Sequence, residues 1–121
     1  MFGLPSNTDL NYLINCELQQ ISIGLHQVIL RFSNDLQITV ESKLEVKENA
    51  SASVTCSWEG EQIVNFDNIL KLINTSIKQY KILDDKNLVL EFSNNNSLII
   101  YDNHQAFESY QIMLPGRSII V

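Results

Sequence analysis

Hydrophobic and polar residues alternate along much of this chain, as they do in strands that bury one face. The longest such run has apolar or small residues at Leu36, Ile38, Val40, Ser42, Leu44 and Val46. The positions between them are polar, namely Gln37, Thr39, Glu41, Lys43, Glu45 and Lys47. We therefore predict one long strand whose first set of residues packs in the core and whose second set faces water.

Shorter runs of the same kind predict further strands. Apolar residues alternate at 28–32, 54–58 and 88–92, and later segments read "LIIYD", "FESYQIML" and "SIIV". Between strands lie "SND", "LDDKN" and "SNNNS", whose residue types favour tight turns. Because tight turns join antiparallel neighbours, the pattern predicts a mainly antiparallel, curled β-meander. It leaves open whether the sheet stays open or closes into a barrel.

Two segments have helical spacing instead of alternation. The second of them, with Asn65 or Asp67 as the N-cap, has apolar residues at Phe66, Ile69, Leu70 and Ile73. The first follows Pro5, with Ser6 or Thr8 as the cap, and has apolar residues at Leu10, Leu13 and Ile14. We predict two short helices whose apolar faces join the core.

The two parts of the chain also resemble each other. The segment that starts at Leu10 matches one that starts at Ile69, an offset of 59, and the segment at Gln27 matches the one at Asn87, an offset of 60. The extra residue falls in "LDDKN", where an insertion turns no strand to the wrong face. We interpret this as an internal duplication of an α-β-β-β unit. Chance similarity between short apolar patterns is the alternative.

Together these elements predict an α+β fold in a single domain, residues 1–121, with pseudo-repeat halves at about 7–58 and 65–114. The 121 residues are 45% hydrophobic and 18% charged, which is typical of one folded domain. Cys16 and Cys56 are expected to be reduced, buried side chains, with a disulfide between them as the alternative.

Charge and hydropathy narrow the classes of function. The chain has 14 acidic and 8 basic side chains, a net charge of -6 and a pI of about 4.7. Such a surface repels phosphate backbones, which argues against nucleic-acid binding. No apolar run approaches the roughly 20 residues that cross a bilayer, and the first residues lack the basic segment of a secretion signal. We therefore expect a cytoplasmic protein with no membrane partner.

No combination of residues predicts catalysis. His26 lies at the start of a predicted strand and His104 in the loop "DNHQ", so both are expected to be turn or surface residues. The Cys and His residues are scattered singly, whereas structural zinc requires closely spaced pairs, and no glycine-rich phosphate-binding motif occurs. We expect a protein that is not an enzyme and holds no metal or cofactor. A ligand pocket lined by His26, Tyr101 and His104 is an alternative.

Surface carboxylates are the remaining candidates for a binding site. The segment 41–61 carries five acids and two lysines, and one rim of such charges would attract a basic partner and speed association. Trp58 is a candidate aromatic anchor, although its parity with Val54 and Cys56 favours burial. The predicted partner-binding residues are Glu41, Glu45, Glu48, Trp58, Glu59, Glu61, Asp84 and Asp85.

The stretches "FGLP", "ISIGLHQVILRF" and "ESYQI", with the terminal "IIV", resemble a family of short bacterial proteins without assigned activity. Small acidic proteins of this type are similar to the immunity proteins of contact-dependent growth inhibition and other polymorphic toxin systems. The resemblance implies an antitoxin that binds a cognate toxin domain and occludes its active or substrate-binding surface. A basic nuclease domain would suit the acidic surface. The alternative is an adaptor module that self-associates, for example as a homodimer, through sheet edges such as "SIIV".

Overall fold

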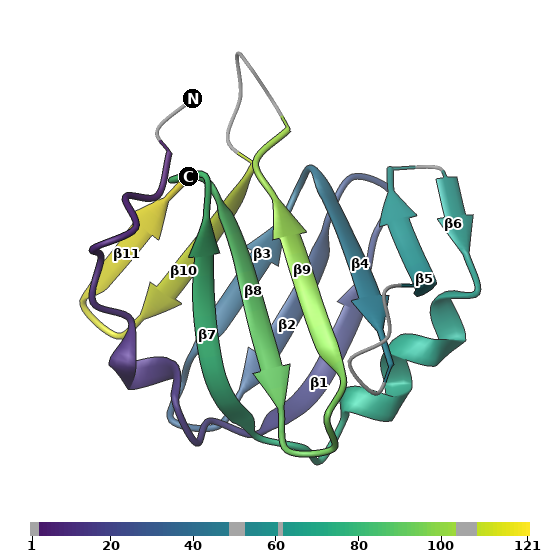
Figure 1. Cartoon of the computed structure of the whole chain (residues 1–121), viewed down its shortest axis with the longest axis horizontal. Helices are drawn as coiled ribbons and strands as arrows, with labels where there is room; N and C mark the ends of the chain where they lie inside the picture. The colour runs from purple at the N-terminus through teal and green to yellow at the C-terminus, as the bar shows by residue number, and fades with distance from the viewer. Residues whose placement is uncertain (1–2, 49–52, 61, 104–108) are drawn as a thin grey trace.

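The computed structural model of the chain describes residues 3–48, 53–60, 62–103 and 109–121. It contains two antiparallel β-sheets that pack face to face, one in front of the other in Figure 1. The five-stranded sheet has the order β1-β2-β3-β10-β11, and the six-stranded sheet has the order β6-β5-β4-β9-β8-β7. The predicted antiparallel strands are confirmed. Over the described ranges, however, they form two sheets that do not close into a barrel, where a single meander was predicted.

The strands of the five-stranded sheet are β1 (Leu18–Ile23), β2 (Val28–Phe32), β3 (Gln37–Val40), β10 (Tyr110–Leu114) and β11 (Arg117–Ile120). Those of the six-stranded sheet are β4 (Lys43–Lys47), β5 (Val54–Glu59), β6 (Gln62–Val64), β7 (Ile77–Leu83), β8 (Asn87–Phe92) and β9 (Ser97–Tyr101). Near the lower end of the molecule in Figure 1 lie two short 3-10 helices, η1 (Asn11–Leu13) and η2 (Phe66–Leu72).

The chain crosses between the sheets twice, from β3 to β4 and from β9 to β10. At the first crossing the N–H groups of Glu41 and Ser42 both donate to the carbonyl of Ser109, at 2.8 and 3.1 Å. The predicted single strand is therefore wrong at this point, because the bend transfers the chain to the other sheet. The predicted core face is confirmed, since the following residues are all buried: Leu36, Ile38, Val40, Ser42, Leu44 and Val46.

The two sheets are joined by the short segments that precede β1 and β7. The N–H of Asn15 donates to the carbonyl of Ile77, and the N–H of Asn74 donates to the carbonyl of Leu18, both at 2.8 Å. At the offset of 59, Asn74 corresponds to Asn15 and Ile77 corresponds to Leu18. In each bond, the asparagine of one half therefore donates to the matching carbonyl of the other half. Both asparagines have a positive φ, 72° and 70°, which asparagine tolerates better than most residues. This joint therefore has a local two-fold arrangement.

The strands after this joint also correspond. β1 and β7 both contain an irregularity in pairing just before Gln20 and Gln79, respectively. The following hairpins differ by one residue, because Ile23 pairs with Val28 across four residues whereas Ile82 pairs with Leu88 across five. The extra residue thus lies in a turn and shifts no strand face. A common origin of the halves stays a prediction.

η2 differs from the predicted helix in the residues that it buries. Sequence spacing predicted an α-helical face that includes Leu70. A 3-10 helix has three residues per turn, so Phe66, Ile69 and Leu72 share the buried side, and Leu70 is 55% exposed. Asn65 is the N-cap, as predicted, but its side chain makes no capping hydrogen bond.

η1 is a single turn whose N-cap is Leu10, so the predicted caps Ser6 and Thr8 are wrong. Its predicted apolar face is confirmed, because Leu10 and Leu13 are buried. No helix within the described ranges is long and apolar enough to span a membrane.

Both cysteines are buried and carry free thiols, as predicted. Burial, with a smaller effect of the Asp67 charge, raises the pKa of the Cys56 thiol to about 11. The thiol therefore stays protonated near neutral pH and packs as an apolar side chain.

Leu72 and Leu70 form a matched pair that tests this arrangement of η2. We expect Leu72→Ala to lower the free energy of unfolding by about 2–5 kcal/mol, because it leaves a cavity in the core. Leu70→Ala should change it by no more than roughly 0.5 kcal/mol, because its side chain is largely in water. Urea unfolding followed by the fluorescence of Trp58 measures both values. A larger loss for Leu70→Ala than for Leu72→Ala would show that η2 buries the α-helical face instead.

Candidate interaction surfaces

The predicted acidic residues do not share one rim. Glu41 precedes β4 and Glu48 follows it, so the strand separates them by about 20 Å at roughly 3.3 Å per residue. At its end of the strand, Glu48 forms an ion pair with Lys71 of η2, with 2.8 Å between Oε1 and Nζ. Glu48 therefore helps to hold η2 against the sheet.

Four predicted carboxylates lie at the opposite end of the two sheets, the upper end in Figure 1. Glu41 lies between β3 and β4, Glu59 ends β5, and the β7–β8 turn contains Asp84 and Asp85. Glu41 is half-buried and the other three residues are exposed. We call Glu41, Glu59, Asp84 and Asp85 the acidic end. Glu61 lies outside the described residues.

Asp85 also has a structural role at this end. Its Oδ1 accepts a hydrogen bond from the N–H of Ser6 at 2.7 Å, and its carbonyl accepts one from the N–H of Leu4 at 2.7 Å. Asp84 and Asp85 have positive φ values of 56° and 54°, as is typical of the predicted hairpin turn. The turn thus anchors the segment that precedes η1.

Glu45 lies on the outer face of the six-stranded sheet in a paired cluster. Its Oε1 accepts a hydrogen bond from the hydroxyl of Tyr101 at 2.5 Å, and its Oε2 lies 3.5 Å from Nζ of Lys43. Nζ of Lys43 also lies 5.1 Å from the centre of the Tyr101 ring, a cation–π contact. Burial, followed by the hydrogen bond and charge of Glu45, raises the pKa of Tyr101 to about 12. Glu45 is thus already paired within the sheet.

Trp58 is a core residue, so the burial that its parity favoured is confirmed and its predicted role as a surface anchor is wrong. It is 0% exposed and points inward from β5, next to Leu44 of β4 and Ile63 of β6. Its Nε1 is buried and has no hydrogen-bond partner in the described part of the chain. Parity along the strand explains the burial, because Trp58 and Cys56 face the same side.

A hydrophobic surface that the sequence did not predict lies on β5, β6 and η2, at the right of Figure 1. Its apolar side chains are 43–55% exposed, and exposed carboxylates lie on the same elements. β6 is the edge strand of its sheet, so no described strand pairs with its outer side. A strand of three residues is too short for alternation to reveal. We define the edge patch as Val54, Glu59, Ile63, Val64, Asp67 and Leu70.

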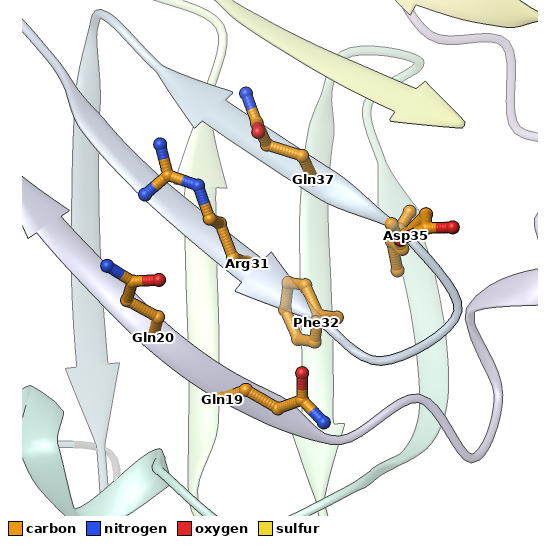
Figure 2. Close-up of a pocket in the computed structure, with 7 residues that line it drawn as sticks. Gln19, Gln20, Arg31, Phe32, Asp35 and Gln37 are labelled. Atoms are coloured by element: carbon orange, nitrogen blue, oxygen red, sulfur yellow. The ribbon is translucent and has the colours of Figure 1, made fainter. Parts of the chain in front are cut away.

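The outer face of the five-stranded sheet carries a polar depression with a volume of about 300 Å³ (Figure 2). Arg31 lies in it, half-buried, and its Nη1 donates to Oγ of Ser22 at 2.7 Å. The sequence did not point to this site, because its residues become neighbours only when strands pair. The depression is lined by Gln19, Gln20, Arg31, Phe32, Asp35, Leu36 and Gln37.

The predicted alternative pocket is not formed by its described members. His26 is exposed in the β1–β2 turn of one sheet, and Tyr101 lies in the other sheet beside Glu45. The depression contains neither residue, and His104 lies outside the described ranges. Among the residues that the structure describes, no group of three or more His, Cys, Asp or Glu side chains could hold a metal ion.

Glu45→Gln tests the paired cluster. We expect it to lower the pKa of Tyr101 from about 12 toward the ordinary value of 10.0, because it removes the neighbouring negative charge. Since this pKa is raised by folding, the stability that Tyr101 contributes is present below pH 10 and is lost as the pH rises from 10 toward 12. NMR titration of the tyrosine ring carbons measures the pKa. Glu48→Gln, at the other end of β4, is the control, and an equal pKa in both variants would contradict the pairing.

Comparison with known proteins places the chain in a family. Neither a curated protein nor a solved structure matches it. The model of one protein family does match, over residues 10–121, and its description is "Family of unknown function (DUF6188)". This description names no activity, so the surfaces themselves must indicate what the protein does. Because the match covers nearly the whole chain, the protein belongs to this family.

Proposed function

We propose that this protein is an immunity protein, a cytoplasmic inhibitor without enzymatic activity that binds a cognate bacterial toxin domain. Binding would occlude the active or substrate-binding surface of the toxin. The observation that carries the proposal is the edge patch, where exposed hydrophobic side chains and exposed carboxylates occur on the same elements, β5, β6 and η2. The resemblance of the sequence to immunity proteins supports the same function.

The apolar part of the edge patch suits a protein partner. Ile63 and Val64 are 50% and 55% exposed and, as successive residues of an edge strand, present apolar side chains on both of its faces. Side chains of this kind in an exposed group are typical of protein-binding surfaces, where apolar contacts are surrounded by polar residues. Trp58, fully buried, is the direct cross-strand neighbour of Ile63 and ties β6 to the core.

The charged part of the edge patch favours a basic partner. Glu59 and Asp67 are exposed on β5 and η2, and the acidic end adds further carboxylates beyond Glu59. With a net charge of -6, the chain attracts a basic surface over the distance of the Debye length, roughly 8–10 Å at physiological salt. A nuclease domain with a basic substrate groove has the complementary charge. Glu45 and Glu48 contribute less, because each already has a partner within the chain.

We also propose that the two halves arose by duplication. The exchanged hydrogen bonds of Asn15 and Asn74, and the matching irregularities before Gln20 and Gln79, support this history. Duplication followed by divergence would leave two similar hairpins free to acquire different surfaces.

The function is tested by growth of bacteria that produce the toxin domain encoded beside this gene, with and without this protein. We expect rescue of growth, and calorimetry of the purified pair should give a nanomolar Kd that weakens with salt, because charges contribute to association. Failure to rescue, together with no heat of binding, would overturn the proposal. A dimer by light scattering in that case would favour self-association, with the edge strand β11 as the contact.

Variants of the edge patch locate the interface. The double variant Ile63→Ser/Val64→Ser should weaken toxin binding at least tenfold, because it removes the apolar contact. Leu83→Ser is the matched control, since Leu83 is 46% exposed on β7 at the opposite edge of the same sheet. Equal effects of both substitutions would place the interface elsewhere.

Glu59→Gln/Asp67→Asn tests the charged part separately. We expect slower association and a flatter salt dependence, with a smaller effect on dissociation. Asp35→Asn changes a carboxylate on the outer face of the other sheet and serves as the control. An unchanged salt dependence in the double variant would exclude these two acids from the contact.

A further inference from the structure

The depression around Arg31 is built by side chains from neighbouring strands. In the sheet, Gln20 of β1 lies opposite Arg31 of β2, and Arg31 lies opposite Gln37 of β3. Figure 2 shows these side chains on one face, with Gln19 and Asp35 nearer the ends of the strands. Two amide groups thus flank the guanidinium in a single cross-strand row.

Arg31 has donors to spare. Its side chain donates one hydrogen bond, to Ser22, among the described residues, and none of their carboxylates lies within 4.0 Å of it, the distance of an ion pair. A guanidinium has five N–H donors, so several face the depression. Gln37 makes only long contacts, 3.4 Å to Oγ1 of Thr39 and 3.9 Å to the sulfur of Met113.

The corresponding site in the other half of the chain shows the difference. There, Gln79 lies opposite Glu91, and Glu91 lies opposite Ser97, at the positions that match Gln20, Arg31 and Gln37. Glu91 accepts a hydrogen bond from Gln79 and forms an ion pair with Lys81 at 3.1 Å. The same backbone arrangement therefore occurs twice. In the second copy the charge of Glu91 is paired within the chain, whereas in the first copy the charge of Arg31 has no ion-pair partner among the described residues.

In the second copy, the residue that matches Gln19, which is Lys78, also has a hydrogen-bond partner. Nζ of Lys78 there donates to Oδ1 of Asn95 at 3.3 Å. Gln19 and Gln20, by contrast, form no side-chain hydrogen bond with any described residue, and both are exposed. The open polar groups of the first copy are thus a property of its side chains and not of the hairpin.

We propose that the Arg31 depression binds the carboxylate of a small polar molecule. This site lies apart from the edge patch and goes beyond the proposed function. A guanidinium binds a carboxylate through two parallel N–H···O bonds, and the planar fork matches that anion better than a lysine would. The amides of Gln20 and Gln37 flank the fork and would hold a second polar group of the ligand. A volume of about 300 Å³ is at the small end of ligand pockets.

The negative charges of the protein favour a singly charged anion over a doubly charged one. Asp35 lines the same depression, and the whole chain carries a net charge of -6. Both disfavour phosphate, whose charge near neutral pH approaches about −1.5 to −2. Asp35 would in addition accept a hydrogen bond from an N–H of the ligand.

The test uses N-acetylglycine, which carries one carboxylate and one amide, and N-acetylglycinamide, its neutral analogue. Each is titrated into the full chain at constant ionic strength while the backbone and side-chain amide signals are followed by NMR. We expect N-acetylglycine to give saturable shifts of the signals of Gln20, Arg31 and Gln37. It should bind at least tenfold more tightly than N-acetylglycinamide. Equal affinities for both compounds, or shifts of signals outside the depression, would overturn the proposal.

Arg31→Gln should weaken the binding of N-acetylglycine at least tenfold. Arg117→Gln is the matched control, because Arg117 is the other arginine of the chain and lies 4.5 Å from the ring centre of Tyr12. It removes the same charge and should change the affinity less than twofold. An equal loss in both variants would indicate a general charge effect and overturn the site. Unchanged amide signals away from the depression check that each variant is folded.

Two further ligands test the source and kind of anion. Inorganic phosphate should bind more weakly than N-acetylglycine, and binding at least tenfold tighter would overturn the choice of carboxylate. The blocked peptide acetyl-Ala-Glu-Ala-amide presents the carboxylate of a protein side chain. If it bound at least tenfold tighter than N-acetylglycine, the ligand would be a protein segment, and the proposal of a small molecule would be overturned.

Discussion

The apolar faces of the two sheets pack into one core, and each crossing of the chain between them leaves backbone and polar groups inside the protein that must be paired. The hydroxyl of Ser42 donates to the carbonyl of Tyr101 at the first crossing. At the second, Oγ of Ser109 donates to Oδ1 of Asp102 at 2.7 Å, and the N–H of Asp102 donates to the side chain of Asn87 at 2.9 Å. An unpaired group at this depth would cost about 1–3 kcal/mol.

These bonds also position the surfaces. They hold the end of β9, and with it Tyr101 and its partners, close to the start of β4. Tyr110, just after the second crossing, is fully buried and donates its hydroxyl hydrogen bond to the carbonyl of Lys86 at 2.7 Å. Burial raises its pKa above the ordinary value. This buried, hydrogen-bonded junction thus holds Glu41 and the end of the turn that contains Asp84 and Asp85.

The two sheets present different chemistry to water although their hairpins are alike. Charged side chains on the six-stranded sheet pair with one another, as in the clusters around Glu45 and Glu91. Uncharged amides on the five-stranded sheet surround one arginine. An internally paired face has little to gain from a new partner, because binding would break contacts that it already has. A face with open donors gains directly, and for this reason the Arg31 depression and the edge strand β6 are the surfaces that we propose for binding.

Much of the secondary structure could be predicted from residue patterns, because alternation and turn chemistry act over a few residues. The turns at Asn34–Asp35 and Asp84–Asp85 have the positive φ values that their residue types favour. The type of helix at η2 could not be predicted in the same way. The stripe through Ile69 and Leu70 fits an α-helix, but the short connection from β6 to β7 takes the tighter 3-10 form, and Leu72 replaces Leu70 in the core.

By itself, the sequence determined which residues of the long predicted strand face the core, where the chain turns, and that the surface is acidic, since each property depends on local spacing or on summed charge. The tertiary structure alone decided how the predicted long strand divides between two sheets and where each carboxylate lies. It also decided that Gln20, Arg31 and Gln37 meet. The physical reason is that strand pairing joins residues far apart in the chain. No local pattern records which side chains then neutralise one another and which stay open to a partner.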